Sequence, residues 1–248
     1  MKNCVIYYFT GSGNTYKIGT KVKECFEKQN YTCELIAMED VEEVTFKNID
    51  YVGLMFPVAI QSTYPNVWAF INQLPQVKGQ KVFMIDTMEY FSGGIVGPVK
   101  KILELKGYDC VGAIELKMTS SMNTKKTSMK VLLDKNNKAE QQAELFVSNL
   151  IVGNTTWKRV PLLSDVMRSI SINRDIWTKH SKKIEITHET CVNCNLCIKK
   201  CPVSALSMNE GMVKINNEKC VSCMRCVTSC PTNAFSLEGK KVVRLIRK

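Results

Sequence analysis

The sequence predicts an α/β protein in which a doubly wound, five-stranded parallel sheet precedes a small cysteine-rich α+β unit. Three observations support this prediction. Short apolar runs alternate with segments of helical spacing over residues 1–153, as strands and helices must alternate when crossovers join parallel strands. The run 51–56 is apolar at nearly every position, which is typical of a strand buried on both faces. Eight of the 12 cysteines then fall within residues 191–230.

Each apolar run in the first part is followed by a segment whose apolar residues have helical spacing. Gly107 is well placed to end the third of these helices. The polar, lysine-rich stretch 119–137 is expected to be a functional or mobile loop, because loops of that length are uncommon in compact domains. We expect strands at residues 4–9, 32–38, 51–56, 81–86 and 110–118, and helices at 15–28, 64–74, 94–105 and 138–152.

The chain divides into a sheet domain at 1–153, a linker at 154–183 and a cysteine-rich domain at 184–248. The linker is basic and amphipathic, and two interpretations stay open: a helix packed on one of the domains, or a helix that docks on a membrane surface or a partner. The apolar residues near helical spacing in the linker are Leu163, Val166, Met167, Ile170 and Trp177.

Composition bounds the class of protein. With 45% apolar and 23% charged residues, the chain is neither disordered nor fibrous. Its longest nearly apolar stretch, 51–60, is about half of what a membrane span needs. The start, MKNCVIYYFTGSG, lacks the core and cleavage site of a signal peptide. We therefore expect a cytoplasmic protein without a membrane span, in which dense cysteines indicate metal binding rather than disulfides.

The cysteine-rich domain contains an internal repeat. The segment that begins at Cys191 aligns with the segment that begins at Cys220, an offset of 29 residues, and each reads C-x2-C-x2-C-x3-C-P. Structural zinc favours two CxxC pairs with a longer separation. In this spacing the fourth cysteine of each copy binds the other iron–sulfur cluster. We therefore expect one [4Fe–4S] cluster on Cys191, Cys194, Cys197 and Cys230, and a second on Cys220, Cys223, Cys226 and Cys201.

This segment resembles the bacterial two-cluster ferredoxins over about residues 184–243. The resemblance implies a small pseudo-twofold fold, and short strands that fit it are expected at residues 183–186, 205–208, 212–215 and 234–237. The fourth cysteine of each copy is expected to start a helix, with Pro202 and Pro231 in its first turn.

A glycine loop, TGSGNT at 10–15, follows the first strand and opens the first helix. Backbone N–H groups at a helix start form an anion site. A Walker loop is excluded because Gly13 is followed by Asn14 and Thr15, and a dinucleotide fingerprint is excluded because its third glycine is Tyr16. The pattern [ST]-x-[ST]-G-x-T fits, and it resembles the phosphate loop of flavodoxins, which bind FMN. The candidate FMN ligands here are Thr10, Gly11, Ser12, Gly13, Asn14 and Thr15.

The resemblance to flavodoxins covers about residues 1–152. It implies the strand order 2-1-3-4-5 and an FMN that touches the loops after strands three and four. Tyr64, Tyr90 and Phe91 are the candidates to stack on the flavin, although Tyr64 alternatively packs in the core. Asp86 either accepts a hydrogen bond from the cofactor or caps the following turn. The remaining cofactor-binding candidates are Pro57, Thr87 and Gly93.

Charge is concentrated at the carboxyl-terminal end of the chain. Residues 154–248 carry a net charge of +10 against +1 for residues 1–153, and the region stays basic after eight thiolates and two cluster cores are counted. We infer an acidic redox partner. Nucleic acid is not expected, because no DNA- or RNA-binding motif accompanies the charge. Much of the excess lies on Arg225, Lys240, Lys241, Arg244, Arg247 and Lys248.

Taken together, the two domains resemble the flavodoxin–ferredoxin fusion proteins of anaerobic prokaryotes. The resemblance implies an intracellular electron-transfer protein that moves electrons between FMN, two [4Fe–4S] clusters and a redox partner. The alternative is an FMN-dependent reductase of a quinone or nitro compound, fed by the clusters. No catalytic residue is predicted, and His180 and His188 are expected to be surface residues.

Overall fold

The computed structural model describes residues 2–91, 94–120, 129–157, 168–169 and 172–242. Its first part is a five-stranded parallel sheet in the order β2-β1-β3-β4-β5, which confirms the expected doubly wound topology. The five strands occupy the places that the apolar runs predicted. They are β1 (Lys2–Tyr8), β2 (Tyr31–Ala37), β3 (Tyr51–Pro57), β4 (Lys81–Met88) and β5 (Asp109–Lys117).

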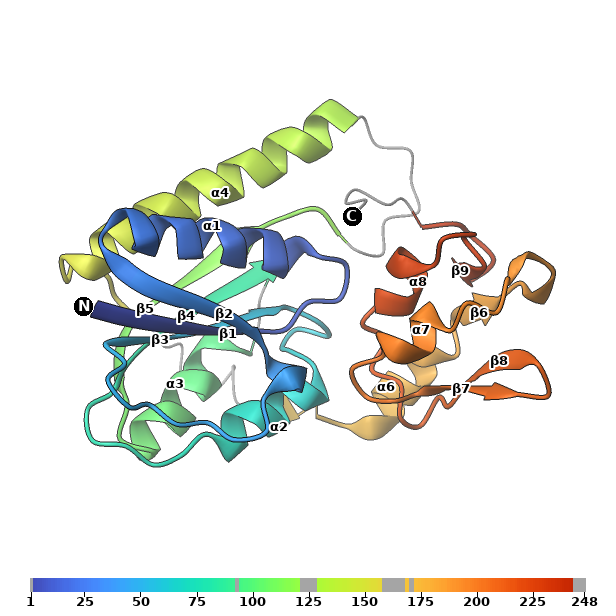
Figure 1. Ribbon diagram of the computed structural model, residues 1–248, viewed down its shortest axis with the longest axis horizontal. Helices are drawn as coiled ribbons and strands as arrows, with labels where there is room; N and C mark the ends of the chain where they lie inside the picture. The colour runs from blue at the N-terminus through green and yellow to red at the C-terminus, as the bar shows by residue number, and fades with distance from the viewer. Residues whose placement is uncertain (1, 92–93, 121–128, 158–167, 170–171, 243–248) are drawn as a thin grey trace.

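Helices cover both faces of this sheet (Figure 1). Side chains alternate along β1, so that Cys4 and Ile6 belong to one hydrophobic core and Val5 and Tyr7 to the other. Two apolar faces explain why β3 is buried along most of its length. The helices α1 (Asn14–Lys28) and α4 (Met129–Ile151) lie on one face, and α2 (Pro65–Gln73) and α3 (Val96–Leu105) on the other; the short η1 (Met38–Asp40) follows β2.

Helix α4 begins at Met129, so the expected loop over 119–137 is wrong for residues 129–137. Leu132 and Asn136 lie one helical turn apart, and both are buried. The Asn136 side-chain oxygen accepts hydrogen bonds from the backbone N–H and the hydroxyl of Thr119, both at 3.4 Å. The polar residues of 119–137 suggested a loop. The contact between Asn136 and Thr119 instead holds the first part of α4 against the end of β5. Residues 121–128 lie outside the described part.

The cysteine-rich domain contains the four short strands that its resemblance to ferredoxins implied, and they form two antiparallel pairs. Strand β6 (Ile184–Ile186) pairs with β9 (Phe235–Leu237), and β7 (Leu206–Asn209) pairs with β8 (Met212–Ile215). The helices are η2 (His188–Thr190), α7 (Leu196–Lys199) and α8 (Arg225–Ser229). The repeat is also visible in the backbone, because positive φ angles recur 29 residues apart at Asn193 and Ser222, Asn195 and Met224, and Ser204 and Asn233.

One expectation for this domain is wrong. Helices α7 and α8 end before the fourth cysteine of each copy, so Pro202 and Pro231 lie in turns after a helix and not in its first turn. A proline there is compatible with the turn because it cannot continue the helix.

The linker contains helix α6 (Arg174–Ser181), which touches both domains. Its Trp177 is 1% exposed and lies 5.2 Å from the Tyr64 ring of the sheet domain, centroid to centroid. At its other end, the Ser181 hydroxyl donates to the Asn217 carbonyl at 3.1 Å. The other apolar residues for which helical spacing was expected in the linker, Leu163, Val166, Met167 and Ile170, lie outside the described residues.

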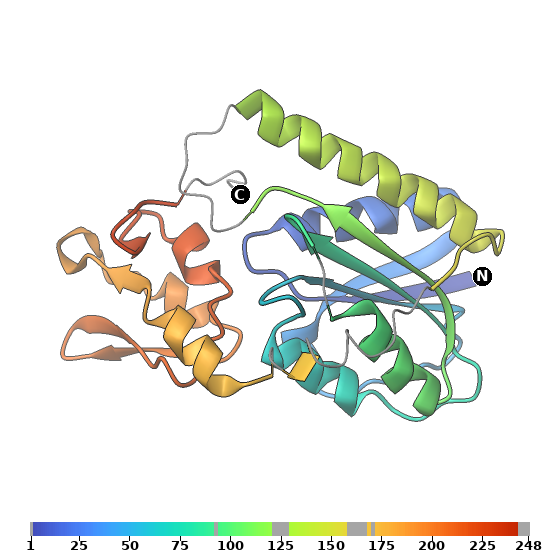
Figure 2. The ribbon, with the colours of Figure 1, turned by 180° about the vertical axis from the view of Figure 1, so that it is seen from behind.

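The cysteine-rich domain sits beyond the edge to which the parallel strands point (Figures 1 and 2). That edge contains the carboxyl ends of the strands, where open α/β sheets bind ligands. Among the helices of the described residues, none combines the length and the apolar character needed to cross a bilayer.

Candidate functional site

A cavity of about 550 Å³ lies between the carboxyl ends of the strands and the cysteine-rich domain. This size falls within the range of small-molecule and cofactor sites, roughly 300–1,000 Å³. Loops that follow β1, β3, β4 and β5 line it from one side, and the linker helix and the second cysteine segment line it from the other. The cavity is therefore assembled by both domains.

The loop after β1 forms the polar end of the cavity, and all of its residues 10–15 except Gly13 line it. Gly13 instead has a left-handed φ of 99° and precedes α1, while its N–H donates to the Thr10 hydroxyl at 3.1 Å. The Asn14 side chain donates to the Thr119 carbonyl at 2.6 Å. The buried hydroxyls of Thr15 and Thr87 are hydrogen-bonded at 2.8 Å. These contacts fix the positive end of the α1 dipole toward the cavity.

The loop after β3 contains a strained two-residue turn. Ala59 and Ser62 exchange backbone hydrogen bonds of 2.9 and 3.0 Å, and the two residues between them, Ile60 and Gln61, have φ angles of 49° and 57°. A β-branched residue in the left-handed region costs on the order of 1–2 kcal/mol. Ile60 and Gln61 both line the cavity, where strain of this kind commonly accompanies ligand binding.

The structure brings one of the three predicted stacking residues to the cavity. Tyr64 lines it and packs on Phe9, with 5.2 Å between ring centroids. Tyr90 and Phe91 do not line it; their side chains are 78% and 62% exposed. The ammonium group of Lys135 lies 5.7 Å from the Tyr90 ring centroid, on the outside of the domain. Pro57 and Thr87 also line the cavity, so their contact with a cofactor stays a prediction, and Gly93 lies outside the described residues.

Three cavity residues come from outside the sheet domain, namely Trp177, His180 and Ser222, and none of these three was predicted. His180 is half-buried there, and not at the surface as expected. Burial lowers the pKa of His180, and the charges of Lys183 and Lys179 lower it further, against an opposing effect of Glu238. The imidazole is consequently neutral at pH 7. In the sequence, the helical spacing around Trp177 was the one indication that the linker packs against another part of the protein.

Asp86 neither lines the cavity nor caps a turn. Asp86 lies on the same face of β4 as Val82 and Met84, which is the face covered by α2 and α3, and it is fully buried there. Within the described part of the chain, neither carboxyl oxygen has a hydrogen-bond partner. Burial raises the pKa of Asp86 well above its usual value, and the neighbouring Glu115 carboxylate raises it further. The folded protein therefore favours the protonated, neutral form of this carboxyl group.

We expect Asp86→Asn to stabilise the protein at neutral and alkaline pH. A raised folded-state pKa favours folding only while the group keeps its proton, so the wild type loses stability as pH rises above the unfolded pKa of 3.8. Asparagine removes that loss, which amounts to about 1.4 kcal/mol per pKa unit. Anaerobic urea unfolding at pH 8 and pH 5 tests this, and the gain should be larger at pH 8. A variant that is equally destabilised at both pH values would show that the carboxylate is ionised and paired.

The first set of cysteines gathers around one small pocket. Cys191, Cys194 and Cys197 line it together with Cys230, which comes from the other copy of the repeat. Burial raises the pKa of Cys197, and the nearby Cys191 and Cys194 raise it further. Cys194 is exposed, so this pocket reaches the protein surface.

The second set lies deeper. Burial raises the pKa of Cys220, Cys223 and Cys226, and the nearby side chain of Cys201 raises each of them further. Cys201 therefore lies near enough to the cysteines of the second copy to influence them electrostatically, and its ligation of the second cluster stays a prediction. Iron must displace these thiol protons when it binds.

Backbone N–H groups donate to the fourth cysteine of each set at equivalent positions. Ala205 donates to the Cys201 sulfur at 3.2 Å, and Ala234 donates to the Cys230 sulfur at 3.3 Å. Hydrogen bonds to sulfur are one of the factors that set cluster potentials. Among the described residues, no three His, Cys, Asp or Glu side chains are grouped as a site for a single metal ion. A four-iron cluster instead separates its ligands, with one thiolate on each iron.

The second cysteine set lies directly against the glycine loop. A Cβ atom added to Gly11 would lie 1.9 Å from the Cys223 carbonyl oxygen, so only glycine fits at this contact. Beside it, Arg225 donates to the Thr10 carbonyl and pairs with Glu39. We expected Arg225 to add to the charge offered to a partner, and this is wrong because the group is engaged within the chain.

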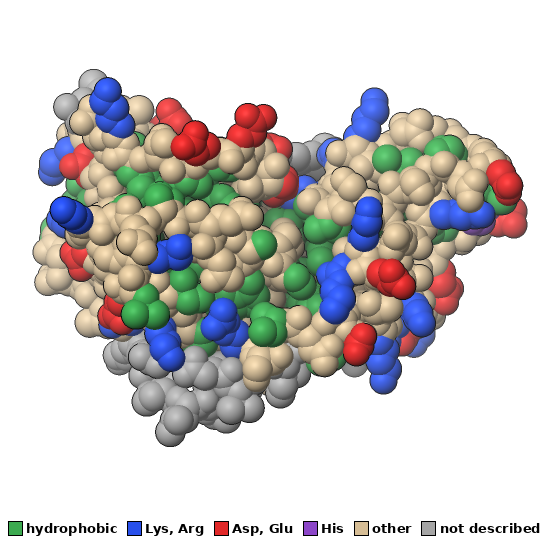
Figure 3. Space-filling model, turned by 90° about the horizontal axis from the view of Figure 1, so that it is seen from below, with side chains coloured by type: hydrophobic (Ala, Val, Ile, Leu, Met, Phe, Trp, Pro, Cys, Tyr) green, Lys and Arg blue, Asp and Glu red, His purple; other side chains and the backbone are tan. Residues whose placement is uncertain are grey.

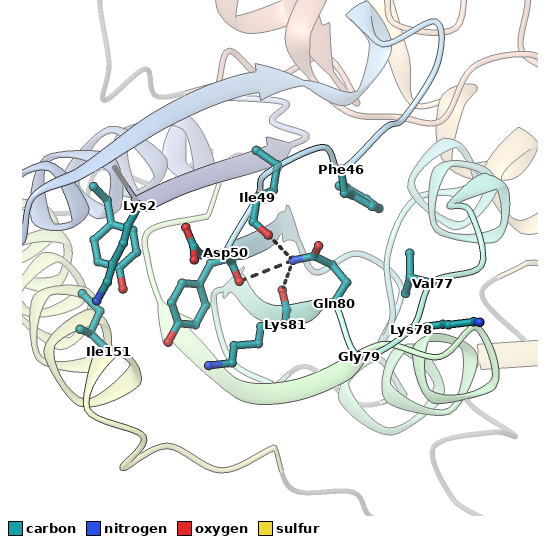
Figure 4. Close-up of a pocket in the computed structure, with 12 residues that line it drawn as sticks. Lys2, Phe46, Ile49, Asp50, Val77, Lys78, Gly79, Gln80, Lys81 and Ile151 are labelled. Atoms are coloured by element: carbon teal, nitrogen blue, oxygen red, sulfur yellow. Dashed lines mark hydrogen bonds between the residues drawn. The ribbon is translucent and has the colours of Figure 1, made fainter.

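A second hollow of about 590 Å³ lies at the opposite, amino-terminal edge of the sheet (Figure 4). Gln80 crosses it and donates to the Ile49 carbonyl at 3.1 Å. The ammonium groups of Lys2 and Lys81 lie over the rings of Tyr31 and Tyr51, at 5.4 and 5.5 Å. Since ligands of open α/β sheets bind at the carboxyl ends of the strands, we take the 550 Å³ cavity as the functional site.

Comparison with known proteins agrees with the second domain. Residues 190–234, which contain all eight clustered cysteines, match the family model described as a 4Fe-4S dicluster domain. No curated protein sequence matches the chain. The chain thus joins a parallel sheet with the flavodoxin-like strand order to a segment that matches a 4Fe-4S dicluster domain.

Similar solved structures cover the first domain. Rubredoxin oxygen:oxidoreductase from the anaerobe Desulfovibrio gigas is 13% identical over 63% of this chain, with a TM-score of 0.47, and the match spans only 38% of that protein. Flavodoxin 1 from Bacillus cereus is 12% identical over 61% of this chain and 98% of its own, with a TM-score of 0.45. Two-electron reduced flavodoxin from Megasphaera elsdenii is 21% identical over 56% of this chain and 98% of its own, with a TM-score of 0.42.

Proposed function

We propose that this protein is a cytoplasmic electron carrier that binds FMN in the cavity and two [4Fe–4S] clusters on its eight clustered cysteines. One observation supports the proposal above all. The cavity is lined both by the glycine loop of the sheet domain and by Ser222, which stands between Cys220 and Cys223. A cofactor bound there contacts both domains, and this is the arrangement that electron exchange between them requires.

The residues of the cavity fit FMN in chemical terms. The start of α1 offers backbone N–H groups and the hydroxyls of Thr10 and Ser12 to a phosphate. Tyr64 and Trp177 add apolar aromatic surface suited to a flat ring system. When bound, FMN supplies one- or two-electron chemistry, whereas each cluster carries one electron.

The placement of the cysteine sets supports an order for the electron path. Cys223 contacts the glycine loop, so the second cluster is adjacent to the cavity. Cys194 of the first set is exposed, and the neighbouring Val192 side chain is 63% exposed. We propose that electrons pass between FMN and the second cluster, then the first cluster, and from there to or from a partner.

The partner that fits best is an acidic redox protein. Lysine and arginine side chains are spread over the smaller lobe, which is the cysteine-rich domain, with acidic side chains among them (Figure 3). Arg225 does not contribute, because it is engaged with Glu39 and Thr10. Opposite charges on a partner would speed its approach to the first cluster. The exposed cations of the described residues in this domain include Lys199, Lys200, Lys214, Lys219, Lys240 and Lys241.

Reduction of a small acceptor remains the alternative function, and it requires access to the flavin. The buried Tyr64–Trp177 pair, which packs the linker helix against the cavity, favours the carrier instead. Rapid turnover of quinones or nitro compounds with a chemical reductant would favour the reductase.

Cofactor content tests the proposal. Protein purified anaerobically should contain about eight iron atoms and one FMN per chain, with the absorbance of both cofactor types, as two four-iron clusters require. About four iron atoms would contradict the paired ligation. A full complement of iron with no affinity for added FMN would contradict the carrier function.

A further inference from the structure

We propose that Arg225 is a latch that holds the second cluster segment against the glycine loop of the FMN cavity. The inference rests on the proposed function, because the latch would set how closely the cluster approaches the flavin. Arg225 lies between Cys223 and Cys226, two predicted ligands of the second cluster. Its guanidinium group contacts Thr10, Glu39 and Phe9 of the sheet domain. Within its own domain it contacts Lys200.

The guanidinium group uses each of its three nitrogens. Nε and Nη2 both donate to the Thr10 carbonyl oxygen, at 3.1 and 2.7 Å. Nη1 forms an ion pair with the Glu39 carboxylate and donates to the Lys200 carbonyl at 3.4 Å. The same group lies 5.3 Å from the centroid of the Phe9 ring. A planar fork of fixed donors is needed to make these contacts together.

These contacts are shielded from water. The side chains of Arg225 and Glu39 are only 16% and 17% exposed, and Phe9 is fully buried. A charge-assisted hydrogen bond in such a place is stronger than one on the surface. The latch therefore differs from the exposed ion pairs of this protein, such as Lys183 with Glu238, which contribute little.

The partners of Arg225 connect the latch to the cavity. Thr10 opens the glycine loop and itself lines the cavity, and its hydroxyl accepts from Gly13 at 3.1 Å. Glu39 lies in η1, directly after β2. Arg225 thus fixes the second cysteine segment to the end of the sheet at two separate elements, next to the Gly11–Cys223 contact.

The test compares Arg225→Met and Arg225→Glu with a matched control, Lys219→Met. Lys219 is exposed and precedes Cys220, so its loss also removes a positive charge beside the second cluster. Each protein is purified anaerobically with its cofactors, and iron and FMN are counted. Two quantities are then measured: the rate of electron transfer from flash-reduced flavin to the clusters, and the hydrogen exchange of the backbone N–H groups in residues 10–15.

We expect both Arg225 variants to keep iron and FMN. Arg225→Glu places a like charge against Glu39, so its transfer rate should fall about tenfold or more as the docked population shrinks. The rate of Arg225→Met should fall less. A third variant, Arg225→Lys, should recover only part of the wild-type rate, because an ammonium group lacks the planar fork of donors. Hydrogen exchange of the backbone N–H groups in residues 10–15 should be fastest in the variant with the largest loss of transfer rate and slowest in the variant with the smallest. Lys219→Met should match the wild type in both measurements.

Unchanged exchange in Arg225→Glu would overturn the latch, whatever happens to the rate. A fall in transfer rate of the same size in Arg225→Met and Lys219→Met, with unchanged exchange, would show that Arg225 acts only through its charge. Failure of the proposed electron-carrier function gives a different result, because the wild type itself would then show no electron transfer from flavin to cluster. The comparison of hydrogen exchange would still test the latch in that case.

Discussion

Gly11→Ala is expected to separate the two domains and slow internal electron transfer by about tenfold or more. The new Cβ atom would lie 1.9 Å from the Cys223 carbonyl oxygen and 3.0 Å from its carbon. Both are backbone atoms, so no side-chain rotation relieves the clash, and overpacking of this kind costs typically about 1–3 kcal/mol or more. The second cluster segment must therefore move away from the glycine loop. Flash reduction of the flavin, followed by cluster absorbance, measures the loss.

Ser12→Ala is the matched control for this variant. It changes the same loop and a cavity-lining hydroxyl without adding an atom at the domain contact. We expect weaker FMN binding with a normal transfer rate in FMN-saturated Ser12→Ala, and the reverse in Gly11→Ala. A wild-type transfer rate in Gly11→Ala would mean that the two domains do not meet at this contact in solution.

The second large effect is expected from the two fourth cysteines of the repeat. Cys201→Ala should lose the second cluster and keep the first, so that iron falls from about eight atoms to about four and the flavin loses its electron acceptor. Cys230→Ala should lose the first cluster, so that flavin-to-cluster transfer persists while delivery to an external protein acceptor stops. The reason is that Cys230 lines a pocket with Cys191, Cys194 and Cys197, whereas Cys201 lies beside the other set.

Electron paramagnetic resonance of the reduced proteins, with iron counts, distinguishes the two variants. The remaining four-iron cluster in each serves as an internal control for folding. Persistent flavin-to-cluster transfer in Cys201→Ala, with transfer lost in Cys230→Ala, would invert the proposed order of the two clusters.

Much of the fold was predictable because local signals agreed with the final arrangement. Apolar runs of strand length marked every strand of the sheet, and the flavodoxin-like glycine loop implied its order. The resemblance to two-cluster ferredoxins likewise predicted the four short strands of the second domain, although not how they pair. Local sequence failed at the start of α4, where the contact between Thr119 and Asn136 decides the structure.

The far side of the cavity could not be predicted, because it forms only when the two domains dock. Nothing near His180 or Ser222 in the sequence indicates the glycine loop they face. Tyr90 shows the converse problem: an aromatic beside glycines suggested flavin stacking, but the loop conformation directs its ring outward. The left-handed turn at Ile60 was equally hidden, since its sequence contains neither glycine nor asparagine.

The central claim is that the flavin and the second cluster exchange electrons within one molecule. Flash reduction of the wild-type flavin at several protein concentrations tests it most directly. We predict first-order reoxidation of the flavin, matched by bleaching of cluster absorbance, at a rate that does not depend on protein concentration. A rate that rises in proportion to protein concentration, or a flavin that stays reduced beside oxidised clusters, would contradict the account.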